Sequence, residues 1–342
     1  MAERKPVATY DNIMRDLKAR KFAPVYILMG EEAYFIDRIC DYIAENVMAP
    51  EERDFNQTIL YGADTTAAQV ADLSRGYPMM AEYRVVIVKE AQALKSLEPL
   101  EKYFENPVPS TILVLCHKNG TIDRRKKVMA KAEAVGVVFE SKKRRDNELP
   151  FFIRNYLAEK DATIDEKSTF IMTEHIGADL NRLASELDKI LISLPEDDRR
   201  ITPAIIEEQI GVSKDFNAFE FRNAIVDRNI YKANQIMTYF EKNPKAGSIY
   251  AFLPMIFNFF QNLMAAYYAP APKDENAIAR YLDLKLSWFA REYVKGMRNY
   301  SGRKTLDIIS KIREIDAKSK GLDNPSTGAG DLMKELVFFI LH

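Results

Sequence analysis

The sequence predicts an α/β domain followed by an all-helical region, and three observations support this division. In about the first 140 residues, short apolar runs alternate with helical stretches, which is typical of a parallel sheet covered by helices. Beyond them the strand patterns cease, and nearly every segment has the apolar spacing of a helix. A basic run at residues 142–145, followed by Pro150, marks the change in composition.

The expected strands of the first region are runs rich in apolar and β-branched residues, which suit a sheet that is buried on both faces. They span residues 24–29, 55–61, 85–88, 111–116 and 136–139. A helix is predicted at 31–47, where apolar residues recur at helical spacing. A second helix is predicted from a cap at Thr65 to about Arg75.

The second region shows helical stripes and helix boundaries. One stripe consists of Leu180, Leu183, Ala184, Leu187, Ile190 and Leu191, and another of Leu306, Ile309, Ile312 and Ile315. Between them a short helix is predicted to begin with Thr202 as its cap and Pro203 in its first turn, and to end at Gly211. Since 342 residues exceed one ordinary core, we expect three domains, at 1–142, 143–211 and 212–342.

The charge balance argues against a protein that grips nucleic acid alone. Lys and Arg total 49, and Asp and Glu total 50. A chain that binds phosphates by itself usually carries a basic excess. If DNA matters here, partner proteins therefore share the contact.

Cysteine content and apolar stretches indicate a cytoplasmic protein. Cys40 and Cys116 are too few for a disulfide framework and fit a reducing compartment as buried apolar fillers. The charged N-terminus lacks a following apolar stretch, so we expect no signal peptide. The longest apolar stretch, 249–269, is interrupted by Pro254 and Asn258, which favours a buried helix over a membrane span.

The arrangement of an α/β domain and a small helical domain is common in nucleotide-driven machines, so a phosphate loop is expected after the first strand. Such a loop needs Gly-x-x-x-x-Gly-Lys-Ser/Thr, because backbone amides wrap the phosphates and the lysine neutralises them. Residues 30–37 instead read GEEAYFID, and Lys89 follows the strand at 85–88 where a magnesium-holding Asp is needed. Both departures predict a chain that does not hydrolyse nucleotides.

Other catalytic and metal sites are also unsupported by the sequence. The histidines and cysteines show no metal-ligand spacing, and Cys116 and His117, as neighbours on a strand, point to opposite faces. No Gly-x-Ser-x-Gly nucleophile motif is present. We therefore expect no catalytic site and no cofactor.

Five segments, in order along nearly the whole chain, resemble bacterial clamp-loader delta subunits. They are YILMGEEAYFI at 26–36, YPMMAEYRVVIVK at 77–89, GADLNRLASELDK at 177–189, AFEFRNAI at 218–225 and IDAKSKG at 315–321. The resemblance implies a degenerate AAA+ module, made of the α/β domain and a helical lid, followed by a helical collar for pentamer assembly. It also implies a subunit that binds and holds open the ring-shaped sliding clamp (beta) on primed DNA during replication. Its other implied partners are the ATP-driven motor subunits (gamma/tau) and the delta-prime subunit. Polymerase activity would belong to the holoenzyme.

The resemblance places the clamp-binding element at Pro78, Met79 and Met80, where family members insert an apolar pair into a pocket of the clamp. Burying two Met side chains contributes roughly 1.5–3 kcal/mol each, and Met adapts to a partner's groove. This sequence departs from the family by carrying Met-Met where Leu or Phe is common, which leaves depth of insertion and affinity open. The alternative is that one or both Met side chains pack into the chain's own core.

Several other residues have both a structural and a functional interpretation. Asp179 begins a helix on which Arg182 pairs with Glu186, although an Arg near this place senses nucleotide in active relatives. The basic runs Arg124-Arg125-Lys126-Lys127 and 142–145 either form solvated faces or contact DNA phosphates. The aromatic segment 250–268 favours core or subunit packing over base stacking.

Three alternatives to the clamp-opening role stay open. A delta-prime-like stator usually carries a Ser-Arg-Cys motif and zinc cysteines, whereas Cys40 and Cys116 follow Ile39 and Leu115. A working NTPase with an atypical loop would bind ATP with magnesium. A free-standing DNA-binding protein would show strong, salt-dependent affinity for duplex DNA.

Overall fold

The computed structural model describes residues 8–243, 249–284, 288–324 and 326–342, which form two compact units that meet in sequence between Arg144 and Arg145. The expectation of no signal peptide falls on the first seven residues, which lie outside the described residues. The predicted boundaries after residues 142 and 211 stay predictions. Within the described ranges, no helix combines the length and the apolar character that a membrane crossing requires.

The first unit contains the predicted parallel sheet, and its strand order is β2-β3-β4-β1-β5. The strands are β1 (Val25–Gly30), β2 (Gln57–Tyr61), β3 (Arg84–Lys89), β4 (Thr111–Lys118) and β5 (Val137–Ser141). All four neighbouring pairs are parallel. Because β1 lies between β4 and β5, its carboxyl end is the topological switch point where ligands bind in many α/β proteins.

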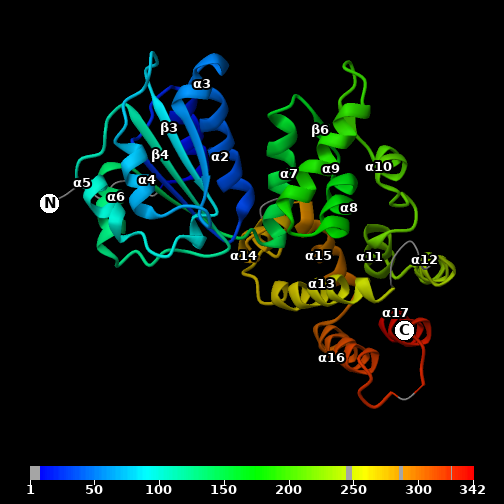
Figure 1. The fold of residues 1–342 in the computed structure, drawn as a ribbon. Coiled ribbons are helices and arrows are strands. Elements are labelled where there is room, and N and C mark those ends of the chain that lie inside the picture. The colour runs from blue at the N-terminus through cyan, green and yellow to red at the C-terminus, as the bar shows by residue number, and fades with distance from the viewer. Residues whose placement is uncertain (1–7, 244–248, 285–287, 325) are drawn as a thin grey trace. The chain divides into compact units, whose positions relative to one another are not determined.

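Helices cover both faces of this sheet (Figure 1). They are α1 (Tyr10–Lys18), α2 (Ala33–Asn46), α3 (Pro50–Asn56), α4 (Ala67–Ser74), α5 (Glu101–Glu105) and α6 (Lys127–Val135). Alternate strand residues, such as Ile27, Val86 and Leu113, pack with α4, α5 and α6 in one core. The helix α2 packs along the other face. Burial on both faces explains the continuous apolar runs of the central strands.

Two predicted boundaries in this unit are wrong by a few residues. Residues 55–61 do not form one strand, because α3 reaches Asn56 and β2 begins at Gln57. The helix α3 forms because Pro50 occupies its first turn and the Glu52 carboxylate accepts a hydrogen bond from the Ala49 amide. The cap of α4 is Thr66 rather than Thr65, since Thr66 and Gln69 exchange hydrogen bonds as a capping box.

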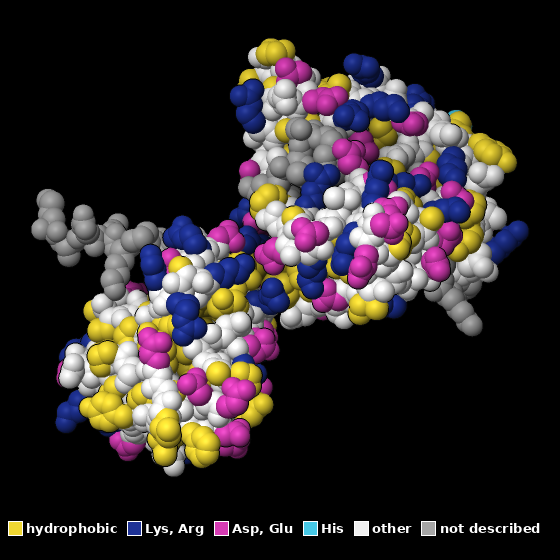
Figure 2. Space-filling view, turned by 90° about the horizontal axis from the view of Figure 1, so that it is seen from above, with side chains coloured by type: hydrophobic (Ala, Val, Ile, Leu, Met, Phe, Trp, Pro, Cys, Tyr) yellow, Lys and Arg dark blue, Asp and Glu magenta, His cyan; other side chains and the backbone are white. Residues whose placement is uncertain are grey.

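The surface carries both signs of charge. Lys/Arg and Asp/Glu side chains are interspersed over the face seen in Figure 2, in keeping with totals of 49 and 50.

The second unit is mainly helical, and its helices begin at α7 (Leu149–Ala158). The others are α8 (Glu166–Ile176), α9 (Leu180–Ser193), α10 (Pro203–Ile210), α11 (Ala218–Val226), α12 (Ile230–Lys242), α13 (Phe252–Ala266), α14 (Glu275–Tyr281), α15 (Trp288–Asn299), α16 (Gly302–Ser319) and α17 (Ala329–Leu341). The prediction of an all-helical region is wrong at one place, because β6 (Thr163–Ile164) pairs in parallel with β7 (Arg200–Ile201). Strands of two residues are too short to produce a period-2 pattern.

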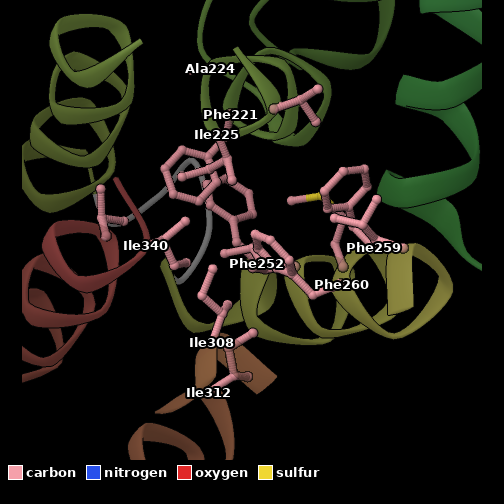
Figure 3. Close-up of a cluster of buried hydrophobic side chains, with 14 of the residues drawn as sticks. Phe221, Ala224, Ile225, Phe252, Phe259, Phe260, Ile308, Ile312 and Ile340 are labelled. Atoms are coloured by element: carbon pink, nitrogen blue, oxygen red, sulfur yellow. The ribbon is translucent and has the colours of Figure 1, made fainter. Parts of the chain in front are cut away.

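A large aromatic and aliphatic core lies between α11, α13, α16 and α17. Phe252, Phe259 and Phe260 of α13 are buried there, which confirms the prediction that the aromatic segment packs into a core. Figure 3 shows Phe221 and Ile225 of α11 among Phe252 and Phe260 of α13, Ile308 of α16 and Ile340 of α17.

The predicted apolar stripe of α16 is partly wrong. Its buried residues are Thr305, Ile308, Ile312 and Ile315, whereas Leu306 is exposed. Positions 305, 308, 312 and 315 fall within one narrow arc at 100° per residue, and position 306 points about 100° away from residue 305. The expected boundaries of α10 at Thr202, Pro203 and Gly211 are confirmed.

Candidate functional site: an exposed apolar loop

The three residues expected to bind a partner lie in the loop between α4 and β3, within residues 75–83. Met79 is 62% exposed, Met80 is fully exposed and Pro78 is half-buried. Tyr77 beside them is exposed as well. The alternative that both Met side chains pack into the chain's own core is therefore wrong. Adjacent exposed apolar side chains of this size commonly mark a protein interaction site.

The backbone at Met80 adopts a left-handed conformation, with φ of 53°. This conformation costs roughly 1–2 kcal/mol for a residue with a side chain. Strained backbone of this kind persists only where surrounding contacts hold it, and it often occurs at functional sites. The loop thus presents Met80 in a fixed, strained turn.

Hydrogen bonds tie the loop to the body of the α/β unit at two points. The amide of Met79 donates to Oδ1 of Asn56 at 2.6 Å, and Nδ2 of Asn56 donates to the carbonyl of Met79 at 3.0 Å. The hydroxyl of Thr111 donates to the carbonyl of Gly76 at 3.3 Å. Gly76 and Met79 are therefore both anchored, one to β4 and the other to the end of α3.

The sequence analysis missed the contribution of α3. Asn56 is buried and Phe55, its chain neighbour, is 68% exposed. Phe55 is therefore an exposed apolar residue next in sequence to the side chain that bonds Met79. The expected strand at 55–61 concealed this role, and a contact across 23 residues leaves no local signal.

The position where a phosphate loop would lie is occupied by the protein's own atoms. Gly30 has φ of 140°, and a Cβ atom there would come within 2.0 Å of the Ser141 carbonyl oxygen. The amide of Glu32 donates to that same oxygen at 3.1 Å, and the amide of Tyr34 donates to the Glu32 carboxylate at 3.1 Å. Phosphate binding at a helix N-terminus depends on free amides. These two amides are already engaged by oxygens of the protein itself.

The nearby lysines face carboxylates of α2. Lys118 Nζ lies 2.6 Å from Asp37, and Lys89 Nζ lies 3.8 Å from Asp41. Lys89 follows the buried part of β3, at the place where the sequence analysis looks for a magnesium-holding carboxylate. Cations therefore stand at this edge of the sheet, and their charge is offset locally.

The first basic run is partly neutralised. Arg124 lies 3.4 Å from both Glu133 and Glu140, and Arg125 lies 2.7 Å from Asp123. Lys126 and Lys127 are exposed at the start of α6. Contacts of all four residues with DNA phosphates stay a prediction.

The cysteines are buried, as expected. Cys116 of β4 lies against Cys40 of α2, and their hydrogen bond together with burial raises the pKa of the Cys116 thiol. His117 is half-buried, with Nδ1 at 3.2 Å from the Gly120 carbonyl oxygen. Among the described residues, no three His, Cys, Asp or Glu side chains are grouped to hold a metal ion.

Asp179 has the structural role considered for it. Its carboxylate accepts a hydrogen bond from the Arg182 amide at 3.0 Å, which caps α9. The predicted pair of Arg182 with Glu186 is replaced by Lys189, whose Nζ lies 3.7 Å from Glu186.

Comparison with known proteins identifies relatives over nearly the whole chain. Residues 26–142 match the family model described as DNA polymerase III, delta subunit. The sequence is 25% identical over 343 residues to DNA polymerase III subunit delta of Bacillus subtilis strain 168, covering 97% of this chain and 96% of that protein. The resemblance seen in five sequence segments is therefore confirmed.

One solved structure shows the same fold, and a second is more distantly similar. The Bacillus subtilis DNA clamp loader delta protein has a TM-score of 0.52 and 22% identity, covering 97% of this chain and 99% of that chain. A Thermotoga maritima RuvB Holliday junction branch migration motor has a TM-score of 0.37 and 14% identity, covering 84% and 86%. The first match confirms the predicted fold class at the level of a parallel α/β sheet domain followed by a helical part.

Proposed function

Because residues 26–142 match the model of DNA polymerase III delta subunits and the whole chain is similar to one of them, we propose that it is a delta subunit, binds the ring-shaped sliding clamp and favours the open ring for loading on primed DNA. The binding element is the loop that presents Pro78, Met79 and Met80. The observation that carries this proposal is the exposure of both Met side chains on a turn whose backbone is strained and tethered.

The binding energy would come from the two methionines entering an apolar pocket of the clamp. Each contributes roughly 1.5–3 kcal/mol when fully buried. The strained turn holds both side chains outward before binding, so less conformational entropy is lost on association. Met also tolerates imperfect pockets because it is unbranched and flexible.

Ring opening is a shift of population. The clamp samples closed and strained-open states, and a partner favours the open state only if it binds that state more tightly. The chain needs no hydrolysis for this step. Two amides at the place of a phosphate loop are engaged by Ser141 and Glu32. ATP-driven motor subunits would therefore control when the loop that carries Met79 and Met80 is available to the clamp.

The other proposed partners follow from the similarity to delta subunits. They are the motor subunits (gamma/tau), delta-prime and primed DNA within the loader. The exposed Lys126 and Lys127 are the residues of the first basic run whose charge we propose for DNA phosphates, since Arg124 and Arg125 have acidic neighbours.

The test is binding of the full chain to the sliding clamp of the same organism, with wild type beside Met79→Ala/Met80→Ala. We expect the double substitution to weaken binding by about 2 kcal/mol or more, the range of an interface hot spot. Ile192→Ala is the matched control, because Ile192 is an equally exposed apolar residue in the helical unit. Its binding should equal that of wild type.

Two results would contradict the proposal. Wild-type chain that does not bind the clamp removes the function, and a folded double variant that binds as wild type moves the site away from this loop. A calorimetric titration with ATP and magnesium tests the non-hydrolysing role separately. Micromolar ATP binding would restore the NTPase alternative.

A further inference from the structure

We propose that Asn56 is a positioning residue for clamp binding, which fixes the turn carrying Met79 and Met80 without touching the clamp. This inference rests on the proposed function, since it concerns how the same loop is held. It assigns a role to a side chain of α3, whose last residue, Asn56, precedes Met79 by 23 residues in sequence.

The hydrogen bonds of Asn56 use the polar groups of its side chain fully. Oδ1 accepts from the Met79 amide at 2.6 Å, while Nδ2 donates to the carbonyls of Met79 and Glu52, both at 3.0 Å. A side-chain amide has two donor hydrogens and one carbonyl oxygen, so each is matched. The N–H and C=O that Asn56 bonds both belong to Met79, and Asp could not make both bonds because it lacks the donor.

The hydrogen bonds of Asn56 act next to the strained residue of the loop. They hold the backbone of Met79 directly before the left-handed residue Met80. A free chain would populate that conformation of Met80 rarely, because it costs roughly 1–2 kcal/mol. Fixing Met79 on both its amide and its carbonyl restricts the rotation that would let the turn relax. The Asn56 tether thus supports the outward presentation of both Met side chains.

Because Asn56 is buried, it can position the loop but cannot itself contact the clamp. Its side chain is 1% exposed, so it offers no surface to a partner. Any effect of its substitution on clamp affinity must pass through the loop or through general stability. The second tether, from Thr111 to Gly76, holds the loop three residues earlier. That hydrogen bond does not itself restrain the backbone between Met79 and Met80.

Two substitutions test the tether in the full-length chain. Asn56→Ala removes all three side-chain hydrogen bonds, and Asn56→Asp keeps the shape but places an oxygen against the carbonyls of Met79 and Glu52. We expect both to weaken clamp binding about tenfold, which corresponds to about 1.4 kcal/mol. Hydrogen exchange of the Met79 amide should accelerate in both variants, because its acceptor is removed or its geometry disturbed.

Matched controls account for lost stability. Asn217 is likewise buried, caps α11 by accepting from the Glu220 amide, and lies in the other unit, so Asn217→Ala should leave clamp binding within twofold of wild type. Ile36→Val removes one buried methyl group from α2 and mildly destabilises the α/β unit, about 0.5–1.5 kcal/mol. It should also bind within twofold of wild type.

A double-mutant cycle distinguishes this inference from the proposed function. In the Met79→Ala/Met80→Ala background, Asn56→Ala should change clamp binding by less than twofold, because the side chains that it positions are gone. An equal loss in both backgrounds would mean general destabilisation and would overturn the inference. A second outcome is that wild type binds the clamp, the Met79→Ala/Met80→Ala variant does not, and both Asn56 variants bind as wild type. In that case the positioning role of Asn56 is wrong, while the proposed function stands. If the methionine variant binds as wild type, the proposed function itself fails.

Discussion

A buried ion pair in the helical unit makes a quantitative prediction about its stability. Arg222 of α11 places Nη2 2.7 Å from the Glu292 carboxylate of α15, and the side chains are only 10% and 19% exposed. The Arg222 guanidinium also lies 4.0 Å from the ring centre of Phe170 on α8. The cluster therefore connects a helix of the predicted lid with two helices of the predicted collar.

The expected magnitudes follow from burial. Arg222→Met keeps most of the apolar contact with Phe170 but leaves the Glu292 carboxylate without its partner. Removing one member of a buried pair costs about 3 kcal/mol, and replacing both by uncharged groups is often nearly neutral. Arg222→Met with Glu292→Gln should therefore recover most of the loss. Arg291, the neighbour of Glu292 on α15, lies 3.6 Å from Glu275 of α14, and both side chains are well exposed. Arg291→Met should therefore change stability by less than about 1 kcal/mol.

Urea unfolding followed by tryptophan fluorescence measures these differences. The single Trp of the chain lies in α15, so its signal reports on the helical unit. A loss below about 1 kcal/mol for Arg222→Met, or no recovery in the double variant, would refute the pairing argument. Separate transitions for 143–211 and 212–342 would instead support the predicted lid and collar as independently folding domains.

Two further predictions concern the α/β unit. Phe55→Ala should weaken clamp binding and change the free energy of unfolding by less than about 0.5 kcal/mol, because this apolar side chain is exposed and adjoins in sequence the residue that tethers the loop; unchanged binding, measured as for the methionine variant, would confine the interface to the loop. Gly30→Ala should destabilise the unit by about 2 kcal/mol or more in urea unfolding, since its Cβ atom would lie 2.0 Å from the Ser141 oxygen; a loss under about 1 kcal/mol would contradict this close approach.

The sheet could be predicted because its signal is local. Runs such as Val85, Val86, Ile87 and Val88 combine β-branching with complete burial, which suits a covered parallel strand. The prediction of one strand at 55–61 was wrong, although Phe55 and Tyr61 both fit strand alternation. Pro50 in the first turn and the Glu52 carboxylate at the cap stabilise a helix over the residues before Gln57. The short strands β6 and β7 are held by pairing across 37 residues, which periodicity does not record.

Some residues of the candidate site could likewise be predicted from the sequence, and others could not. Met79 and Met80 could be proposed as partner-binding residues because a sequence segment resembles a family signature, and both side chains are exposed. Asn56 could not, because its importance lies in three hydrogen bonds that only the fold creates. The left-handed backbone of Met80 also escapes prediction, since nothing about a methionine signals positive φ.

The energetics of the loop limit what binding alone can achieve. Two buried methionines contribute roughly 3–6 kcal/mol together, while moving a two-state ring from 1% to 99% open requires about 5.5 kcal/mol of differential affinity. The pair therefore suffices only if nearly all its burial occurs in the open ring. Contacts that are equally good with the closed ring anchor the subunit and leave the equilibrium unchanged. A loop held rigid by Asn56 suits differential binding better than a pliable one, because a fixed turn cannot follow the pocket as the ring changes shape.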